Sequence, residues 1–435
     1  MNPSFAELVR VFARIGCISF GGPAGQIAIM HRELVDDRQW IDEPRFLAAL
    51  NLCHLLPGPE AQQLAIYIGW RLHGIRGGLA AGLLFVIPGA LVMLGLSTAY
   101  ALAAGIGWIA ALFLGVKAAV IAVVVQALLR VAGRALDTGF KRGIALAAFA
   151  ALFFFSAPFP LVVIAAGAGG ALAARARPAW LALKPIVPGA HQSHPTVART
   201  LATMVGWAAI WAAPLLLVLV ALGPDHVLLR IGLFFSKLAI VTFGGAYAVL
   251  AYMAQQAVES QGWLTAREMA DGLGLAETTP GPLILVTQHV GFLAAFRAPG
   301  AFPPLLAGVL GAALTTWVTF APCFLWIFTL APWMDKLQSS LRLKAALAAV
   351  TAAVVGVIGN LTVWFALHVL FARMTQVSIG PFHANLPVLA SFDWRAALLA
   401  ALAAVLLFKV KLGMMRTLGV AALGGLALEA LAMLA

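Results

Sequence analysis

Two basic residues, Arg14 and Lys237, occupy matching places in the chain, each six residues before a Phe-Gly-Gly tripeptide. Two cationic groups brought together would favour a doubly negative oxyanion, because arginine can bind two oxygens at once and lysine acts as a point charge. Basic residues in apolar sequence also snorkel to the membrane surface or signal topology, and this alternative stays open. The matching positions favour an anion-binding role for the pair.

The tripeptides belong to a longer motif that occurs twice. The first copy begins at Phe20 and ends with Pro57-Gly58-Pro59, and the second begins at Phe243 and ends with Pro280-Gly281-Pro282, 223 positions further on. The copies align without a gap and share twelve identities in forty positions. One structural unit has therefore been used twice.

Glycine and proline interrupt a helix, and each new helix start exposes backbone N–H groups and the positive end of a helix dipole. Two such breaks near the membrane midplane would form an anion site without any charged side chain. Nearby hydroxyl and amide groups can add hydrogen bonds, although such groups often only cap the backbone. The predicted substrate-binding residues are Arg14, Ser19, Gly21, Gly22, Gln26, Pro57, Gly58, Pro59, Gln63, Lys237, Thr242, Gly244, Gly245, Thr279 and Gly281.

Four ionisable residues near the breaks are candidates for coupling or gating: Glu60, Glu277, His54 and Arg32. A carboxylate in an apolar span is a functional candidate, and binding of a proton is the obvious role. Glu60 is also expected in the first turn of a helix, where stabilising the helix dipole could be its whole role. His54 could be a satisfied buried imidazole, and Arg32 could pair with Asp36 on a face at the membrane surface.

The helices that carry the first motif are short. We expect them at residues 4–19, 24–35, 44–56 and 60–70, and none reaches the ~20 residues that span a bilayer. Short, interrupted segments at matching places in two halves are typical of a transporter's binding site.

The composition is that of an integral membrane protein. Of the 435 residues, 63% are hydrophobic and only 10% are charged, whereas about 25% are charged in ordinary soluble proteins. The formal charge of +12 comes from clusters beside apolar runs, so it indicates topology and anionic lipid, not nucleic acid. The sequence contains no phosphate-loop motif and no cysteine or flavin fingerprint, so we expect gradient-driven transport with no cofactor, no metal and no enzymatic activity.

Basic loops predict the topology. By the positive-inside rule, the segment 175–200 is a cytoplasmic linker. A further apolar run at 201–224 reverses the chain before the second copy, so the copies are predicted to enter the membrane from opposite sides. We expect an all-α polytopic protein with two inverted repeats, at 1–174 and 225–435, whose broken helices meet near the midplane. Further spans are expected at 78–102, 106–129, 143–157, 159–174, 305–330, 342–371, 395–408 and 417–434.

The first motif resembles that of the chromate ion transporter (CHR) family. The resemblance rests on Phe20–Ile27, Met30–Glu33 and Leu55–Ala65, together with the second copy from Phe243 to Pro282, and it covers essentially the whole chain. It implies a secondary transporter of the bacterial inner membrane that exports chromate and confers chromate resistance. The second copy departs where Leu283 replaces Glu60, which argues against a strictly symmetric site.

Sulfate is a tetrahedral dianion of similar shape, so a transporter of sulfate or another oxyanion, with or without coupling to protons or cations, is the alternative. Transporters with inverted repeats often form dimers, and a homodimer within the lipid bilayer is possible. Runs of small residues such as 165–170 could serve such an interface or pack within the chain.

Overall fold

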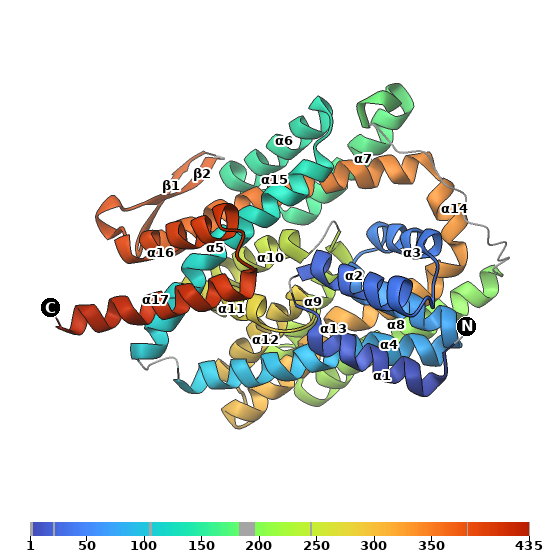
Figure 1. The fold of residues 1–435 in the computed structure, drawn as a ribbon, viewed down its shortest axis with the longest axis horizontal. Coiled ribbons are helices and arrows are strands. Elements are labelled where there is room, and N and C mark those ends of the chain that lie inside the picture. The colour runs from blue at the N-terminus through green and yellow to red at the C-terminus, as the bar shows by residue number, and fades with distance from the viewer. Residues whose placement is uncertain are drawn as a thin grey trace. The chain divides into compact units, whose positions relative to one another are not determined.

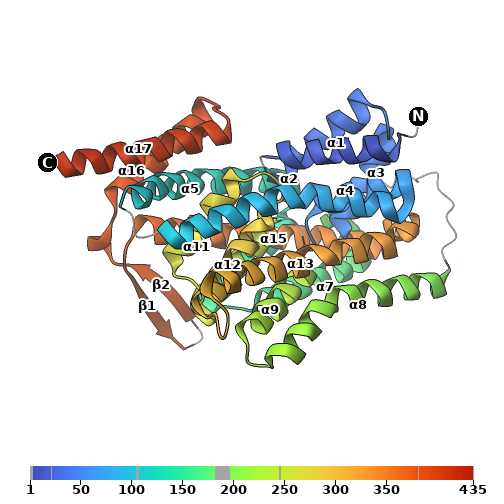
Figure 2. The ribbon, with the colours of Figure 1, turned by 90° about the horizontal axis from the view of Figure 1, so that it is seen from below.

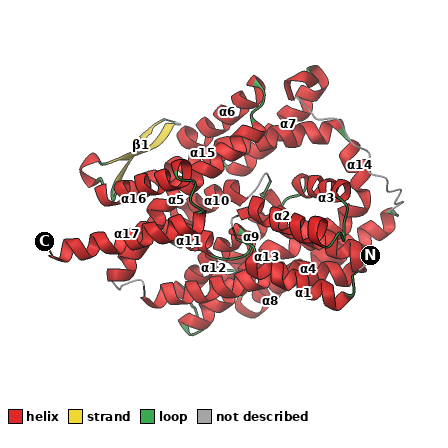
Figure 3. Ribbon diagram, viewed as in Figure 1, coloured by secondary structure: helices red, strands yellow, loops and turns green. Residues whose placement is uncertain are grey.

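The computed structural model describes residues 3–20, 22–103, 107–181, 196–243, 246–380 and 382–434. Helices form nearly all of the secondary structure, and the only strands in these ranges make one antiparallel hairpin (Figures 1 and 3). Seven of the described helices are long and apolar enough to cross a membrane. The chain is therefore an all-α polytopic membrane protein, as its composition predicts.

The first motif copy folds into short helices joined by breaks. Ser4 caps the first helix with its side chain, and Asp42 caps the helix that precedes the Pro-Gly-Pro break. A π-helical turn at Arg32–Asp37 ends the second helix. The helices of this copy are α1 (Phe5–Ile18), α2 (Gly22–His31), α3 (Glu43–Leu55) and α4 (Glu60–Ala103).

The second copy repeats this local structure. Its third helix covers the residues 223 positions beyond those of α3, and Thr265 stands at the cap position that matches Asp42. A π-helical turn again precedes this helix, at Gln256–Ser260. The helices of this copy are α9 (Val227–Val241), α10 (Ala246–Gln255), α11 (Ala266–Thr278) and α12 (Val286–Arg297), with a 3-10 turn at Leu283–Leu285 before α12.

Further helices, most of them long and apolar, follow each copy. Those after the first copy are α5 (Gly107–Ala135), α6 (Gly139–Phe155), α7 (Phe159–Ala176) and α8 (Val197–Leu222), with a 3-10 turn at Pro178–Leu181 after α7. Those after the second are α13 (Pro304–Leu330), α14 (Met334–Ser339), α15 (Leu341–Leu370), α16 (Trp394–Ala404) and α17 (Met414–Leu434), with a 3-10 turn at Ala331–Trp333. The hairpin of β1 (Met374–Ile379) and β2 (Phe382–Pro387) lies between α15 and α16, and a second 3-10 turn follows it at Leu389–Ser391.

Helix α4 is interrupted about one third of the way along its length. His73 and Gly74 leave the helical conformation, and Gly74 has a φ of +61°, which glycine adopts without strain. This break lies in a basic stretch that holds Arg71 and Arg76. It divides the 44 residues of α4 into the short segment that follows Pro59 and a second segment long enough to span the membrane.

The chain divides into two compact units, each assembled from three stretches. Unit 1 contains residues 1–98, 184–249 and 279–344, and unit 2 contains residues 99–183, 250–278 and 345–435. Both units therefore draw on both halves of the chain, and the motif copy at residues 20–59 lies wholly in unit 1. The repeat boundaries predicted from the sequence stay a prediction, and residues 182–195 of the expected linker lie outside the described residues.

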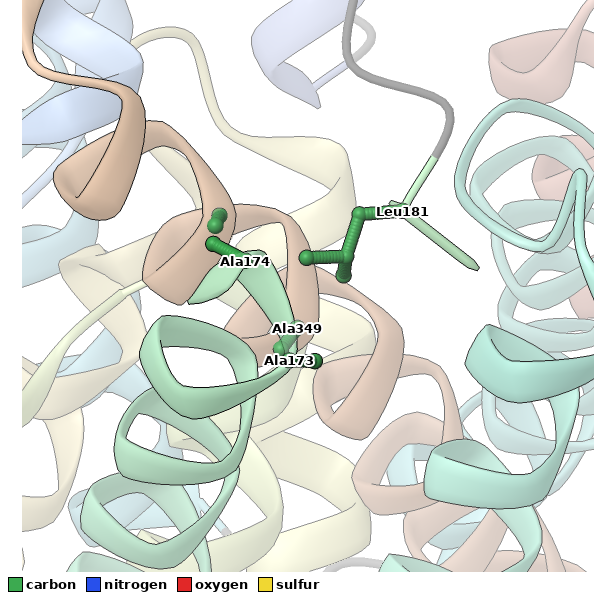
Figure 4. Packing of buried hydrophobic residues seen from close by; sticks show 5 residues of the cluster. Ala173, Ala174, Leu181 and Ala349 are labelled. Atoms are coloured by element: carbon green, nitrogen blue, oxygen red, sulfur yellow. The ribbon is translucent and has the colours of Figure 1, made fainter. Parts of the chain in front are cut away.

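Small residues let the helices of each unit approach closely. In unit 1, Gly291 of α12 faces Gly311 and Thr315 of α13, and these two helices pack along their lengths (Figure 2). In unit 2, Gly115 of α5 lies against the backbone of Ala421 in α17. A second cluster in unit 2 joins Ala173, Ala174 and Leu181 to Ala345 and Ala349 (Figure 4).

Candidate site at the crossing of the two motifs

Two equivalent hydrogen bonds join the motif copies within unit 1. The backbone N–H of Gly58 donates to the carbonyl oxygen of Thr242 at 2.8 Å, and the N–H of Gly281 donates to that of Ser19, also at 2.8 Å. Gly281 is the counterpart of Gly58, and Thr242 is the counterpart of Ser19, at the 223-residue offset. Exchanging the copies converts one bond into the other, which is what a local two-fold axis produces. We call this arrangement the motif crossing.

The two acceptor residues, Ser19 and Thr242, each form a hydrogen bond to the end of the helix before them. The hydroxyl of Ser19 donates to the carbonyl of Ile15 at 2.6 Å, and the hydroxyl of Thr242 donates to that of Leu238 at 2.7 Å. Each hydroxyl thus satisfies a backbone carbonyl in the last turn of its helix. The backbone carbonyl of the same residue is left to accept the hydrogen bond from the other copy. Ser19 and Thr242 are both almost fully buried.

The two glycines at the crossing cannot be replaced by larger residues without strain. Gly58 has a φ of +119° and Gly281 has a φ of +87°, a region that residues with a Cβ atom avoid. A Cβ atom on Gly58 would lie 2.9 Å from Nε2 of Gln63 and 3.0 Å from Sγ of Cys323. The Pro-Gly-Pro sequences therefore meet a steric requirement as well as ending a helix.

Gln26 adds a contact that has no counterpart in the other copy. Its Nε2 donates to the carbonyl oxygen of Gly281 at 2.5 Å, and the residue is 1% exposed. The equivalent position in the second copy is Val249, which has no donor. The crossing is therefore two-fold symmetric in its backbone bonds and asymmetric in its side chains.

The start of α4 combines a helix N-terminus with buried polar side chains. Glu60, Gln62 and Gln63 are 6%, 1% and 0% exposed. Nε2 of Gln63 donates to the carbonyl of Pro57 at 2.7 Å. Among the described residues, Oε2 of Glu60 and both amide heavy atoms of Gln62 lack a hydrogen-bond partner. Buried polar groups usually have partners, so these atoms make the start of α4 a candidate site.

The equivalent start of α12 places other polar groups in unit 1. Nε2 of Gln288 donates to the carbonyl of Ala90 in α4 at 2.9 Å, and Nδ1 of His289 lies 2.9 Å from the hydroxyl of Ser97. Thr279 is buried before this helix. These contacts tie the start of α12 to the second segment of α4.

The predicted cations lie apart from the buried groups. Arg14 has 61% of its side chain exposed and forms an ion pair with Glu33 at 3.6 Å. Lys237 and Arg32 are exposed. His54 is half exposed, and its Nδ1 is 3.9 Å from Oε1 of Glu60.

The remaining predicted residues divide into three groups. Pro57 and Pro59 are buried at the crossing, and Gly22 is half-buried with a φ of +69°. Glu277 is 4% exposed and is the penultimate residue of α11 in unit 2. Gly21, Gly244 and Gly245 lie outside the described residues.

A network of charges surrounds Arg14. The almost fully buried carboxylate of Glu33 is held by Arg14 and by Arg38, whose Nε lies 3.5 Å from it. On the same segment, His31 forms ion pairs with Glu43 and Asp36. The hydrogen bond from His31 to Glu43 raises the pKa of this imidazole above its usual 6.5, and the nearby charge of Asp36 adds to the effect. The network fixes the α2 end of unit 1 to α1 and α3.

Sequence reasoning missed a buried charge cluster in unit 2. Nζ of Lys117 in α5 lies 3.2 Å from Oδ1 of Asp271 in α11, and the hydroxyl of Tyr100 donates to Oδ2 of Asp271 at 2.8 Å. Lys117 is the only charged residue between positions 106 and 129, which is the signal that could have found it. Within the described ranges, no group of three His, Cys, Asp or Glu residues is placed to hold a metal ion.

Apolar spans, a duplicated motif and helices that start inside the packed structure define the class of polytopic membrane transporters with broken helices. The sequence profile of the Chromate transporter family matches residues 6–171 and 229–427. The chain belongs to this family, and the two matched segments correspond to the two halves.

Curated relatives agree with this assignment. The chain is 33% identical over 387 residues to a chromate transport protein of Pseudomonas aeruginosa, covering 87% of this chain and 84% of the relative. It is 30% identical over 353 residues to a chromate transport protein of Cupriavidus metallidurans, covering 81% and 80%. A probable chromate transport protein of Synechococcus elongatus is 28% identical over 363 residues, covering 83% and 84%. No solved structure matches the chain significantly.

Proposed function

We propose that this protein is a secondary transporter that exports chromate across the bacterial inner membrane and thereby confers chromate resistance. The observation that carries the proposal is the motif crossing, where the start of α4 leaves the buried polar atoms of Gln62 and Glu60 without partners. The names of the relatives support chromate as the substrate.

The anion would bind at the start of α4. Backbone N–H groups and the helix dipole attract negative charge there, and the amide of Gln62 supplies two further N–H donors. Gln63 is already committed to Pro57, so it shapes the site more than it binds the anion. Hydrogen bonds from neutral groups explain how a dianion can be bound and still released.

Glu60 would act as a gate at the same place. An ionised carboxylate beside a dianion is repulsive, so the anion binds when Glu60 is protonated or turned towards His54. The distance of 3.9 Å to the half-exposed ring of His54 provides such a partner. Glu277 would have a corresponding role at the end of α11, before the second break.

Arg14 and Lys237 would draw the anion towards the site from the outside, since both are exposed. Arg14 would exchange its partner Glu33 for the incoming oxyanion. Alternating access would follow from inverted repeats that move relative to each other. The inside-negative potential favours export by about 2.3 kcal/mol per charge for each 100 mV.

Flux measurements in inside-out membrane vesicles test this proposal. Chromate uptake should follow an imposed potential that is positive inside the vesicle, and Gln62→Leu should lower uptake strongly while the protein remains folded. Gln126→Leu, which changes a half-buried glutamine of α5, is the matched control. Absence of wild-type uptake under any gradient, in vesicles shown to contain folded protein, would exclude chromate transport.

Sulfate is the second candidate substrate, because amide and backbone N–H donors recognise charge and tetrahedral shape rather than the central atom. Excess sulfate should therefore compete with chromate in the same vesicles. Growth of a host deficient in sulfate uptake upon expression would instead favour sulfate import as the function.

A further inference from the structure

The cluster of Lys117, Asp271 and Tyr100 in unit 2 has no part in the anion site described above. Its ion pair joins α5 to α11, and the hydrogen bond from Tyr100 comes from the end of α4. Lys117, Asp271 and Tyr100 are 5%, 5% and 7% exposed. The three side chains thus form a buried polar cluster where the apolar helices α4 and α5 meet the more polar helix α11.

The burial of this pair distinguishes it from other ion pairs of the same unit. The side chains of Lys117 and Asp271 are each 6% exposed, whereas in the pair of Lys141 and Asp137 the aspartate is 46% exposed. Taking both charges out of water costs free energy that their attraction often fails to recover, and an apolar pair packs as well or better. Charged residues kept in a membrane span are therefore functional candidates.

Comparison of the two motif copies shows that the fold does not require this charge. Asp271 lies on α11, and the equivalent position on α3 is Ala48, 223 residues earlier. Both helices have the same length and the same bounds at that offset. A helix in this place therefore forms without an aspartate, so Asp271 serves something other than helix formation.

The charged groups around the pair are few. Arg267 and Glu268 lie one turn earlier on α11, and both act electrostatically on the cluster. Asp393 caps α16, which packs on α5, and its charge acts on Lys117. The close approach of α17 to α5 is made by the small residues Ala421 and Gly425.

We propose that Asp271, with Lys117 as its counter-charge, binds and releases a proton that is coupled to anion transport. The inference rests on the proposed function. Protonation of the carboxylate ends its ionic attraction to Lys117, so the packing of α11 against α5 is weakened until the proton leaves.

Helix α11 connects this event to the anion site along the chain. Asp271 lies six residues before Glu277, and the helix ends at Thr278. Thr279 and Pro280 follow directly, and the next residue, Gly281, forms one of the two bonds of the motif crossing in unit 1. The proposal requires that a shift of α11 reach the crossing along this covalent connection.

The test separates net transport from exchange in vesicles that contain the full-length protein. In Asp271→Asn, the acceleration of chromate uptake by a pH gradient should fall by about tenfold or more, because the amide cannot take up the proton. Exchange of labelled for unlabelled chromate, which needs no net proton movement, should persist. Asp137→Asn removes the aspartate of the more exposed Lys-Asp pair in the same unit and should behave as wild type.

A double variant, Lys117→Met with Asp271→Leu, distinguishes coupling from a structural role. If the pair only held helices together, the apolar pair would restore gradient-driven transport, and the proposal would fail. We expect the double variant to retain exchange alone. Gradient-driven uptake in Asp271→Asn equal to that of wild type would also overturn the inference. So would a Lys117→Met variant that shows a raised KM for chromate but keeps the wild-type response of uptake to the pH gradient. Failure of the wild type to move chromate would refute the proposed function instead.

Discussion

The side chain of Gln26 donates a hydrogen bond of 2.5 Å to the backbone carbonyl of Gly281, a residue 255 positions away. Gly281 is thereby held twice by the first motif copy, since its N–H also donates to Ser19. The reciprocal residue, Gly58, is held to the second copy through Thr242, and Val249 replaces the glutamine. The break before α12 is therefore fixed more firmly to its partner copy than the break before α4 is.

Removal of this contact should cost stability. In Gln26→Leu the buried carbonyl of Gly281 loses a donor, a change that typically costs about 1–3 kcal/mol. We expect a lower midpoint of thermal unfolding in detergent and reduced transport. Val249→Ala, a truncation at the equivalent buried position, serves as the comparison. Equal unfolding midpoints for wild type and Gln26→Leu would show that the bond does not stabilise the crossing.

The two crossing glycines should differ in their tolerance of alanine. Both substitutions force a Cβ atom into the left-handed region, at a cost of about 1 kcal/mol or more each. Gly58→Ala also meets Cys323 and Gln63, whereas the nearest atom to a Cβ on Gly281 is the flexible side chain of Leu285 at 3.3 Å. Chromate transport should therefore fall further in Gly58→Ala than in Gly281→Ala. Gly133→Ala, in open space on α5, should leave uptake and unfolding unchanged.

Arg14→Ala and Lys237→Ala should each abolish chromate resistance while leaving the amount of protein in the membrane unchanged. Each removes one of the two exposed cations that attract the dianion. Arg14→Lys keeps the charge and should retain part of the activity. Wild-type resistance in either alanine variant would remove that residue from the proposed pathway.

The ion pairs of His31 predict a pH-dependent contribution to stability. The folded-state pKa of His31 is raised above 6.5 by Glu43, so its stabilising effect is fully present below that pH. The effect is lost as the pH rises through the raised value. The unfolding midpoint of wild type should therefore exceed that of His31→Gln most clearly in mild acid, and the difference should shrink as the solution becomes alkaline. A constant difference over this range would contradict the assignment.

Sequence patterns predicted the short helices well, because the breaks that end them are local. Helix α3 was expected at residues 44–56 and extends from Glu43 to Leu55, before Pro57. The expected span at 395–408 contains α16 and a π-helical turn at Val405–Lys409, and it is not among the seven described helices long enough to cross a membrane. The hairpin of β1 and β2 was not predicted, since its register depends on cross-strand pairs such as Val377 with Ala384.

The contacts of the candidate site could not be predicted in the same way. The duplication indicates that Gly58 and Gly281 are equivalent, but only the folded chain shows that each binds the opposite copy. Lys117 was visible as a charge in an apolar run, yet its partner Asp271 is distant in sequence and has an alanine at the equivalent position. Partner choice over such separations depends on tertiary packing.

The interleaved composition of the two units bears on how the polypeptide can be produced. Each unit takes stretches from before and after the segment 182–195, so neither half of the gene encodes an independently folding body. Expressed alone, residues 1–181 or 196–435 should be degraded, whereas co-expression of the two fragments should reconstitute the transporter. The segment that joins the halves can accordingly be cut without loss of transport only when both fragments are made in the same cell.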